Sequence, residues 1–171
     1  IYYADRLNQL PLAVFGIAMG AVLLPALSKA IKQNNQADIA TTQNRSLEFC
    51  LFISLPSAAG LFILSTPIIH ILFERGAFLA EDTLYTAKVL SVFALGLPAY
   101  ILIKVLVTCY FAREDTKTPL YISVISVIIN IVVSLALIQS MREMGIAAAT
   151  AISAWINALL LYIILRMRNN I

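Results

Sequence analysis

The sequence is poor in charge and in the residues that most often carry chemistry. Only 12% of its 171 residues are charged and 61% are hydrophobic, whereas soluble domains have about 25% charged residues. Two cysteines and one histidine offer no cluster with metal-ligand spacing. Cys50 and Cys109 each lie in an apolar run, where we interpret them as packing residues. We therefore predict no metal site, no catalytic residue and no enzymatic activity.

Five long runs hold almost none of the charge; the exceptions are Lys104 in the third run and His70 near the end of the second. A helix of roughly 20 apolar residues crosses a hydrocarbon core of about 30 Å. The sequence therefore predicts an all-α fold, a polytopic transmembrane helical bundle with one membrane domain over residues 1–171. The five predicted spans are 7–28, 49–73, 89–112, 118–141 and 144–165.

Prolines and polar connectors punctuate these runs. Each proline inside a span removes a backbone donor and favours a kink, which suits either a hinge around a substrate path or a packing role. The polar connector 29–48 predicts an interfacial helix that continues into the second span. Thr118 before a proline predicts the cap of the fourth helix. The prolines in the interior of spans are Pro11, Pro25, Pro56, Pro67 and Pro98.

Basic residues predict how the chain is oriented. Seven of them fall on one side of the predicted topology: Lys29, Lys32, Arg45, Arg113, Lys117, Arg166 and Arg168. Four fall on the other side, among five acids: Arg6, Arg75, Lys88 and Arg142. Because basic residues accumulate in cytoplasmic loops, the first span should run inward. The chain opens without an initiator methionine or a signal region, so we expect it to be part of a longer protein.

A few polar side chains lie deep in the predicted spans. Asn130 and Asn157, with Ser134 and Thr150 nearby in register, are predicted to form either an interhelical hydrogen bond or part of a cation site. Lys104 lies about 12 Å from the end of its helix, so it either snorkels or faces a cavity. By these physical arguments Arg6, beside Asp5, is an interface anchor.

Three stretches resemble one known family in the right order. They are residues 3–28 (YADRLNQLPLAVFGIAMGAVLLPALS), 72–78 (LFERGAF) and 113–119 (REDTKTP). Together they resemble the MurJ (MviN) family of bacterial lipid II flippases, over essentially the whole chain. The resemblance implies a fold of the MOP flippase superfamily with fourteen helices, of which this chain is helices eight to twelve. It also implies a multi-pass protein of the bacterial cytoplasmic membrane.

The resemblance changes the interpretation of Arg6, which it places in the central cavity of the family. The implied substrate-binding residues are Arg6, Asp5 and Lys104, and a guanidinium suits the paired oxygens of the lipid II diphosphate. Alternating access would then move the headgroup across the membrane. Some members bind sodium near the positions of Asn130, Ser134 and Thr150. Here Ser134 stands where some members have an acid.

The expected partners are lipid II, membrane lipids and the amino-terminal half of the transporter, with no nucleic acid; no cofactor is expected other than sodium. Two alternatives stay open. One is another transporter of the superfamily, either a polysaccharide-lipid flippase or a cation-coupled multidrug exporter. The other is a membrane scaffold that does not transport and binds partners through small-residue helix faces.

Overall fold

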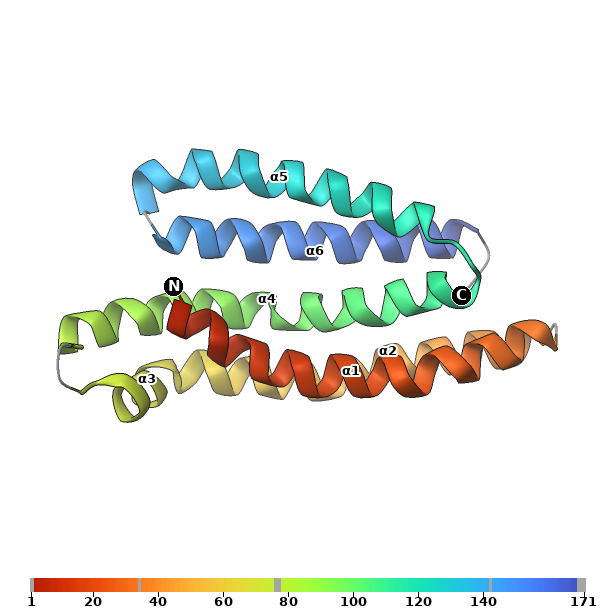
Figure 1. The fold of residues 1–171 in the computed structure, drawn as a ribbon, viewed down its shortest axis with the longest axis horizontal. Helices are drawn as coiled ribbons and strands as arrows, with labels where there is room; N and C mark the ends of the chain where they lie inside the picture. The colour runs from red at the N-terminus through yellow and green to blue at the C-terminus, as the bar shows by residue number, and fades with distance from the viewer. Residues whose placement is uncertain (1, 34, 76–77, 142, 169–171) are drawn as a thin grey trace.

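The computed structural model describes residues 2–33, 35–75, 78–141 and 143–168, apart from the side chains of residues 15–20 and 140. Helix is the only regular secondary structure in these ranges, which confirms the predicted all-α fold (Figure 1). The six helices are α1 (Tyr2–Lys32), α2 (Gln36–Ile63), α3 (Ser65–Phe73), α4 (Ala80–Ala112), α5 (Lys117–Met141) and α6 (Glu143–Met167).

Four of these helices are long and apolar enough to cross a membrane, judged over the described residues: α2, α4, α5 and the helix α6. The prediction of five spans is therefore too high by one for this part of the chain. Helix α1 covers the predicted span 7–28 and is 31 residues long. Its six consecutive side chains at 15–20 lie outside the described residues, so its apolar character rests on the sequence alone.

The predicted span 49–73 is wrong as a single helix, because the chain breaks at Leu64 between α2 and α3. Pro67 explains the position of the break. It has no N–H to donate to the carbonyl of Ile63, four residues earlier, and its ring crowds that carbonyl. Helix α2 accordingly ends at Ile63, and Pro67 lies in the first turn of α3, where proline is tolerated. The other four prolines stay inside continuous helices.

Two smaller predictions about connectors have different outcomes. Helix α2 does run without a break from the connector into the second span. The predicted cap at Thr118 is wrong, because α5 begins one residue earlier. The carboxylate of Asp115 provides the capping interaction instead, accepting hydrogen bonds from the backbone N–H of Thr118 at 3.0 Å and from its hydroxyl at 2.7 Å.

Helix α4 lies at the centre of the bundle, between α6 on one side and the α1–α2 pair on the other (Figure 1). Small residues let its neighbours approach: the alanines Ala147, Ala151, Ala154 and Ala158 on α6 are all buried. The hydroxyl of Tyr110 donates to the carbonyl of Leu161 at 2.9 Å, joining α4 to α6 across the core. Helix α5 packs on α6 at the edge of the bundle and is mostly exposed.

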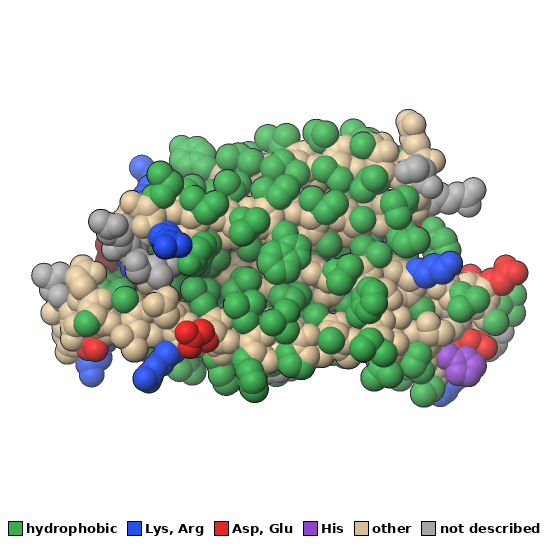
Figure 2. Space-filling view, turned by 180° about the vertical axis from the view of Figure 1, so that it is seen from behind, with side chains coloured by type: hydrophobic (Ala, Val, Ile, Leu, Met, Phe, Trp, Pro, Cys, Tyr) green, Lys and Arg blue, Asp and Glu red, His purple; other side chains and the backbone are tan. Residues whose placement is uncertain are grey.

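Charged side chains lie near the two ends of the bundle, and apolar side chains cover the middle of the face shown in Figure 2. The antiparallel packing of the helices brings together the end of α1, the start of α2, the α4–α5 connection and the end of α6 (Figure 1). We call this the basic end; it holds Lys29, Lys32, Arg45, Arg113, Lys117, Arg166 and Arg168. Arg142, which was assigned to the opposite end, lies outside the described residues.

Candidate functional site

The first predicted site residues, Asp5 and Arg6, lie at the start of α1, with Asp5 in its first turn, at the end opposite the basic end. The side chain of Gln9, one turn later, contacts both: its amide donates to Asp5 Oδ2 at 2.5 Å and accepts from Arg6 Nη1 at 3.3 Å. The Arg6 guanidinium also lies over the ring of Tyr2, 5.0 Å from its centroid. Arg6 is exposed, and a guanidinium has five N–H donors. This side chain can therefore bind an anion while Gln9 holds it in place.

The third substrate candidate, Lys104, lies on α4, eight residues before that helix ends at Ala112. The structure records no contact between it and Arg6. Lys104 is exposed, and within the described part of the chain its ammonium has no hydrogen-bond or ion-pair partner. A lysine at the centre of a membrane helix costs about 2.5–3.5 kcal/mol when it faces lipid. A position facing a polar space, or reaching the interface, avoids this cost.

The structure brings together two of the three predicted cation-site residues. The amide of Asn130 on α5 donates to Thr150 Oγ1 at 3.4 Å and to Ser153 Oγ at 3.1 Å, both on α6. The hydroxyls of Thr150 and Ser153 in turn donate to backbone carbonyls one turn earlier. Ser134 is half-buried and its hydroxyl has no described partner. Asn130 thus forms the interhelical hydrogen bond that was one of the two predicted alternatives.

These residues line part of a cavity of about 260 Å³ between α4, α5 and α6. Its polar lining is larger than the sequence analysis predicted and comprises Tyr100, Ser123, Ser126, Asn130, Thr150, Ser153 and Asn157. A signal was present in the sequence, since the polar positions of α5 and α6 recur at spacings of three and four residues, which place them on one helical face. Tyr100 gave no such signal, because its place depends on the packing of α4.

As arranged, Asn130 does not offer an oxygen ligand to a cation beside the hydroxyls of Thr150 and Ser153. The side chain of Asn130 presents its amide nitrogen to the two hydroxyls, whereas a hard cation takes oxygen ligands. The cavity lining contains no carboxylate, and Ser134 is not among the lining residues. The hydrogen bonds among Asn130, Thr150 and Ser153 form a neutral network, while two other oxygens of the lining, Tyr100 Oη and Asn157 Oδ1, are buried without a hydrogen-bond partner among the described residues.

Two polar clusters tie the loops at opposite ends of the bundle. The Glu74 carboxylate lies 2.7 Å from His70 Nδ1 and accepts a hydrogen bond from the Thr83 hydroxyl; these two bonds lower the pKa of Glu74. At the basic end, Arg168 donates to Asp115 at 2.7 Å. The hydrogen bonds from Thr118, with a smaller effect of Arg168, lower the pKa of Asp115. Both clusters fix loop geometry.

Comparison with known proteins identifies relatives with the same helical arrangement. A solved structure titled "Lipid II flippase MurJ, inward closed conformation" superposes with a TM-score of 0.87 and 34% sequence identity, over 96% of this chain and 34% of that one. A probable lipid II flippase MurJ of Rhizobium meliloti (strain 1021) is 47% identical over 170 residues, which is 99% of this chain and 32% of the relative. One from Vibrio cholerae is 37% identical over 162 residues, 95% of this chain and 31% of the relative.

The chain therefore spans about a third of the length of the curated relatives it matches. The profile of the family described as "Lipid II flippase MurJ" matches residues 1–171. Sequence and fold agree over nearly every residue of the chain, and the chain belongs to the MurJ family of lipid II flippases.

Proposed function

We propose that this chain forms one wall of a flippase that carries a lipid-linked diphosphate, lipid II, across the bacterial cytoplasmic membrane. The observation that carries the proposal is the exposed guanidinium of Arg6, held by Gln9 at the end of the bundle opposite the basic end. A planar guanidinium matches paired phosphate oxygens. Asp5 positions Gln9 through the 2.5 Å hydrogen bond, and Gln9 in turn contacts Arg6. Asp5 therefore helps to orient the Arg6 side chain, and Arg6 binds the diphosphate.

Lys104 supplies a second cationic position on α4, the central helix. A diphosphate that enters from the basic end passes Lys104 before it reaches Arg6, and an exposed ammonium on the way lowers the cost of moving a polar headgroup past apolar helices. The part of the transporter that faces this wall belongs to the other two thirds of the relatives' length. Rocking of the two parts about the site gives alternating access, and no covalent step is involved.

A chimera tests this function with the chain as it is. The matched third of the Rhizobium meliloti relative is replaced by residues 1–171, and the chimera is expressed in cells depleted of their own lipid II flippase. Growth is expected, because 47% identity over 170 residues preserves the fold. The matched control is the same relative without any segment at this position. Failure of a correctly inserted, normally expressed chimera to support growth would contradict the proposal.

A further inference from the structure

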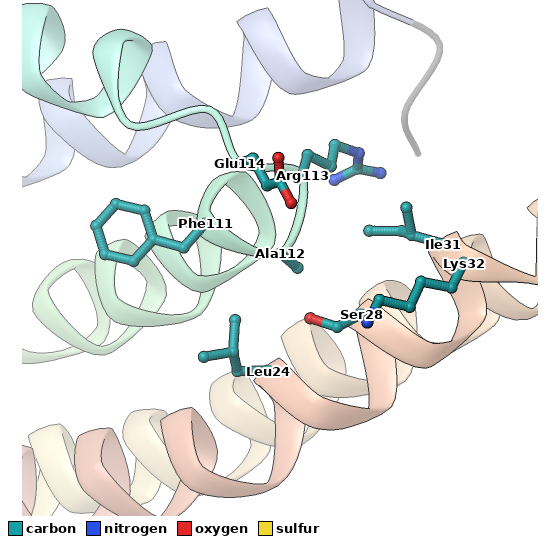
Figure 3. A pocket seen from close by; sticks show the side chains of 8 residues that line it. All are labelled: Leu24, Ser28, Ile31, Lys32, Phe111, Ala112, Arg113 and Glu114. Carbon is teal, nitrogen blue, oxygen red and sulfur yellow. The ribbon is translucent and has the colours of Figure 1, made fainter.

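A second pocket lies at the basic end of the bundle, away from Asp5 and Arg6. It has a volume of about 380 Å³ and opens between the last turns of α1 and the end of α4 (Figure 3). Pockets of about 300–1,000 Å³ are large enough to hold a small-molecule ligand. The residues that line it are Leu24, Ser28, Ile31, Lys32, Phe111, Ala112, Arg113 and Glu114.

The lining changes from apolar to charged along the helix axis. Leu24 on α1 and Phe111 on α4 line the side nearer the middle of the bundle (Figure 3) and are 38% and 48% exposed. Lys32 lies eight residues beyond Leu24 in the last turn of α1, about 12 Å farther toward the end of the bundle. This gradient is the one a phospholipid meets between its acyl chains and its headgroup. Basic pockets between membrane helices on the cytoplasmic side are a known setting for lipid headgroups.

The charges around the pocket have both signs. Lys32 on α1 and Glu114 after α4 line it from opposite sides (Figure 3). Across the described residues, neither of these two side chains has a hydrogen-bond or ion-pair partner. Arg113 adds a second cation, half-buried and bonded to the Cys109 carbonyl at 3.2 Å. A ligand that carries both an anionic and a cationic group would complement Lys32 and Glu114 at once.

The backbone holds Glu114 here in a conformation that side chains rarely adopt. Its φ is 59°, the only positive φ among the described non-glycine residues. Its N–H bonds to the Phe111 carbonyl at 3.0 Å, and the N–H of Asp115 bonds to the Tyr110 carbonyl at 3.1 Å. This is the Schellman ending of a helix, in which the left-handed position is usually glycine. Strained residues of this kind concentrate at ligand-binding sites.

We propose that this pocket binds an aminophospholipid of the surrounding membrane, with Lys32 and Arg113 on its phosphate and Glu114 on its primary ammonium group. The acyl chains then continue over Leu24 and Phe111 into the hydrocarbon. The site is separate from the transport function proposed above, because it needs only the ends of α1 and α4. An anionic lipid without an amine leaves Glu114 unpaired, and a trimethylated amine has no N–H to donate to it.

Binding is measured on the purified chimera by native mass spectrometry, with phosphatidylethanolamine, phosphatidylcholine and phosphatidylglycerol as probes. Phosphatidylethanolamine is expected to bind about tenfold more tightly than phosphatidylcholine, the equivalent of about 1.4 kcal/mol. Glu114→Gln should abolish this preference, whereas Lys32→Ala should weaken the binding of both lipids about tenfold. Lys29→Ala is the matched control, because Lys29 is exposed in the same part of α1 and does not line the pocket; it should change nothing.

Three results would overturn the proposal. Equal affinity of the unmodified chimera for the ethanolamine and choline lipids would remove the role of Glu114. Tightest binding of phosphatidylglycerol would make this a simple anion site. Displacement of phosphatidylethanolamine by a polyprenyl diphosphate would assign the pocket to the transported lipid instead. None of these measurements requires transport, so the lipid-binding result remains interpretable even if the flippase proposal fails.

Discussion

The hydrogen bonds between Asn130 and α6 allow a prediction about the stability of the helix pair. Asn130→Ala removes two donated hydrogen bonds, to Thr150 and Ser153. Interhelical hydrogen bonds in membranes contribute about 0.6 kcal/mol each, with a maximum near 1.7. Both hydroxyls keep their own backbone acceptors, so no new unsatisfied donor is created. The free energy of unfolding should therefore fall by only about 1–2 kcal/mol.

The assay is unfolding of the purified chimera by increasing SDS, repeated in sodium and in potassium at equal ionic strength. A double-mutant cycle with Ser153→Ala should give a coupling of about 0.6 kcal/mol. Because the network is neutral, the loss should be the same in both salts. Ser123→Ala, at another cavity-lining position, is the control and should change stability by less than about 0.5 kcal/mol. A loss that appears only in sodium would refute this reasoning and restore the cation site.

Three further predictions concern packing, pH and topology. Gly145→Ala should destabilise the α5–α6 pair by about 1–3 kcal/mol in the same SDS assay, because a Cβ there would lie 2.7 Å from a backbone oxygen of α5. An unchanged stability would contradict the close packing of these two helices. The pKa of Asp115 is lower in the folded chain than its ordinary value, so its stabilising effect is present at neutral pH and is lost as the pH falls through the folded pKa. Asp115→Asn should therefore lower the free energy of unfolding at neutral pH and flatten the acid side of its pH dependence. An unaltered acid side would argue against the capping role. In a background without the two native cysteines, a cysteine at Ala80 should react with an impermeant thiol reagent in intact cells and one at Thr116 should be protected; the opposite pattern would reverse the proposed orientation.

Much of the helical architecture followed from the sequence, because an uncharged run long enough to cross a bilayer has few other stable states. The break at Leu64 did not follow. Pro67 and Pro98 each lack the backbone N–H that would donate to a carbonyl four residues earlier. Helix α4 nevertheless continues through Pro98, whereas α2 ends before Pro67. Pro98 is buried at the centre of the bundle, where neighbours pack on both sides of it. Local sequence does not report that difference in packing.

The candidate sites also include features that the sequence predicts and features that depend on how the helices pack. The pairing of Asn130 with Thr150 was predictable from their depth in adjacent spans, and the structure brings them together. The position of Tyr100 beside them depends on how α4 packs against two other helices. The pocket between Lys32 and Glu114 joins positions 82 residues apart in the sequence, and no local pattern marks it. The proposed substrate role of Arg6 came first from family resemblance, since an exposed arginine at a helix end looks like an anchor.

The central claim is that Arg6 binds the diphosphate of the transported lipid. The direct measurement is the amount of lipid II that reaches the outer leaflet in cells whose only flippase is the chimera, compared at equal expression for Arg6, Arg6→Lys and Arg6→Ala. The account predicts loss of translocation for Arg6→Ala and partial recovery for Arg6→Lys, because an ammonium keeps the charge but loses the planar, two-pronged geometry. Full translocation by both variants would contradict it, since an interface anchor tolerates lysine and a residue without a substrate role tolerates alanine.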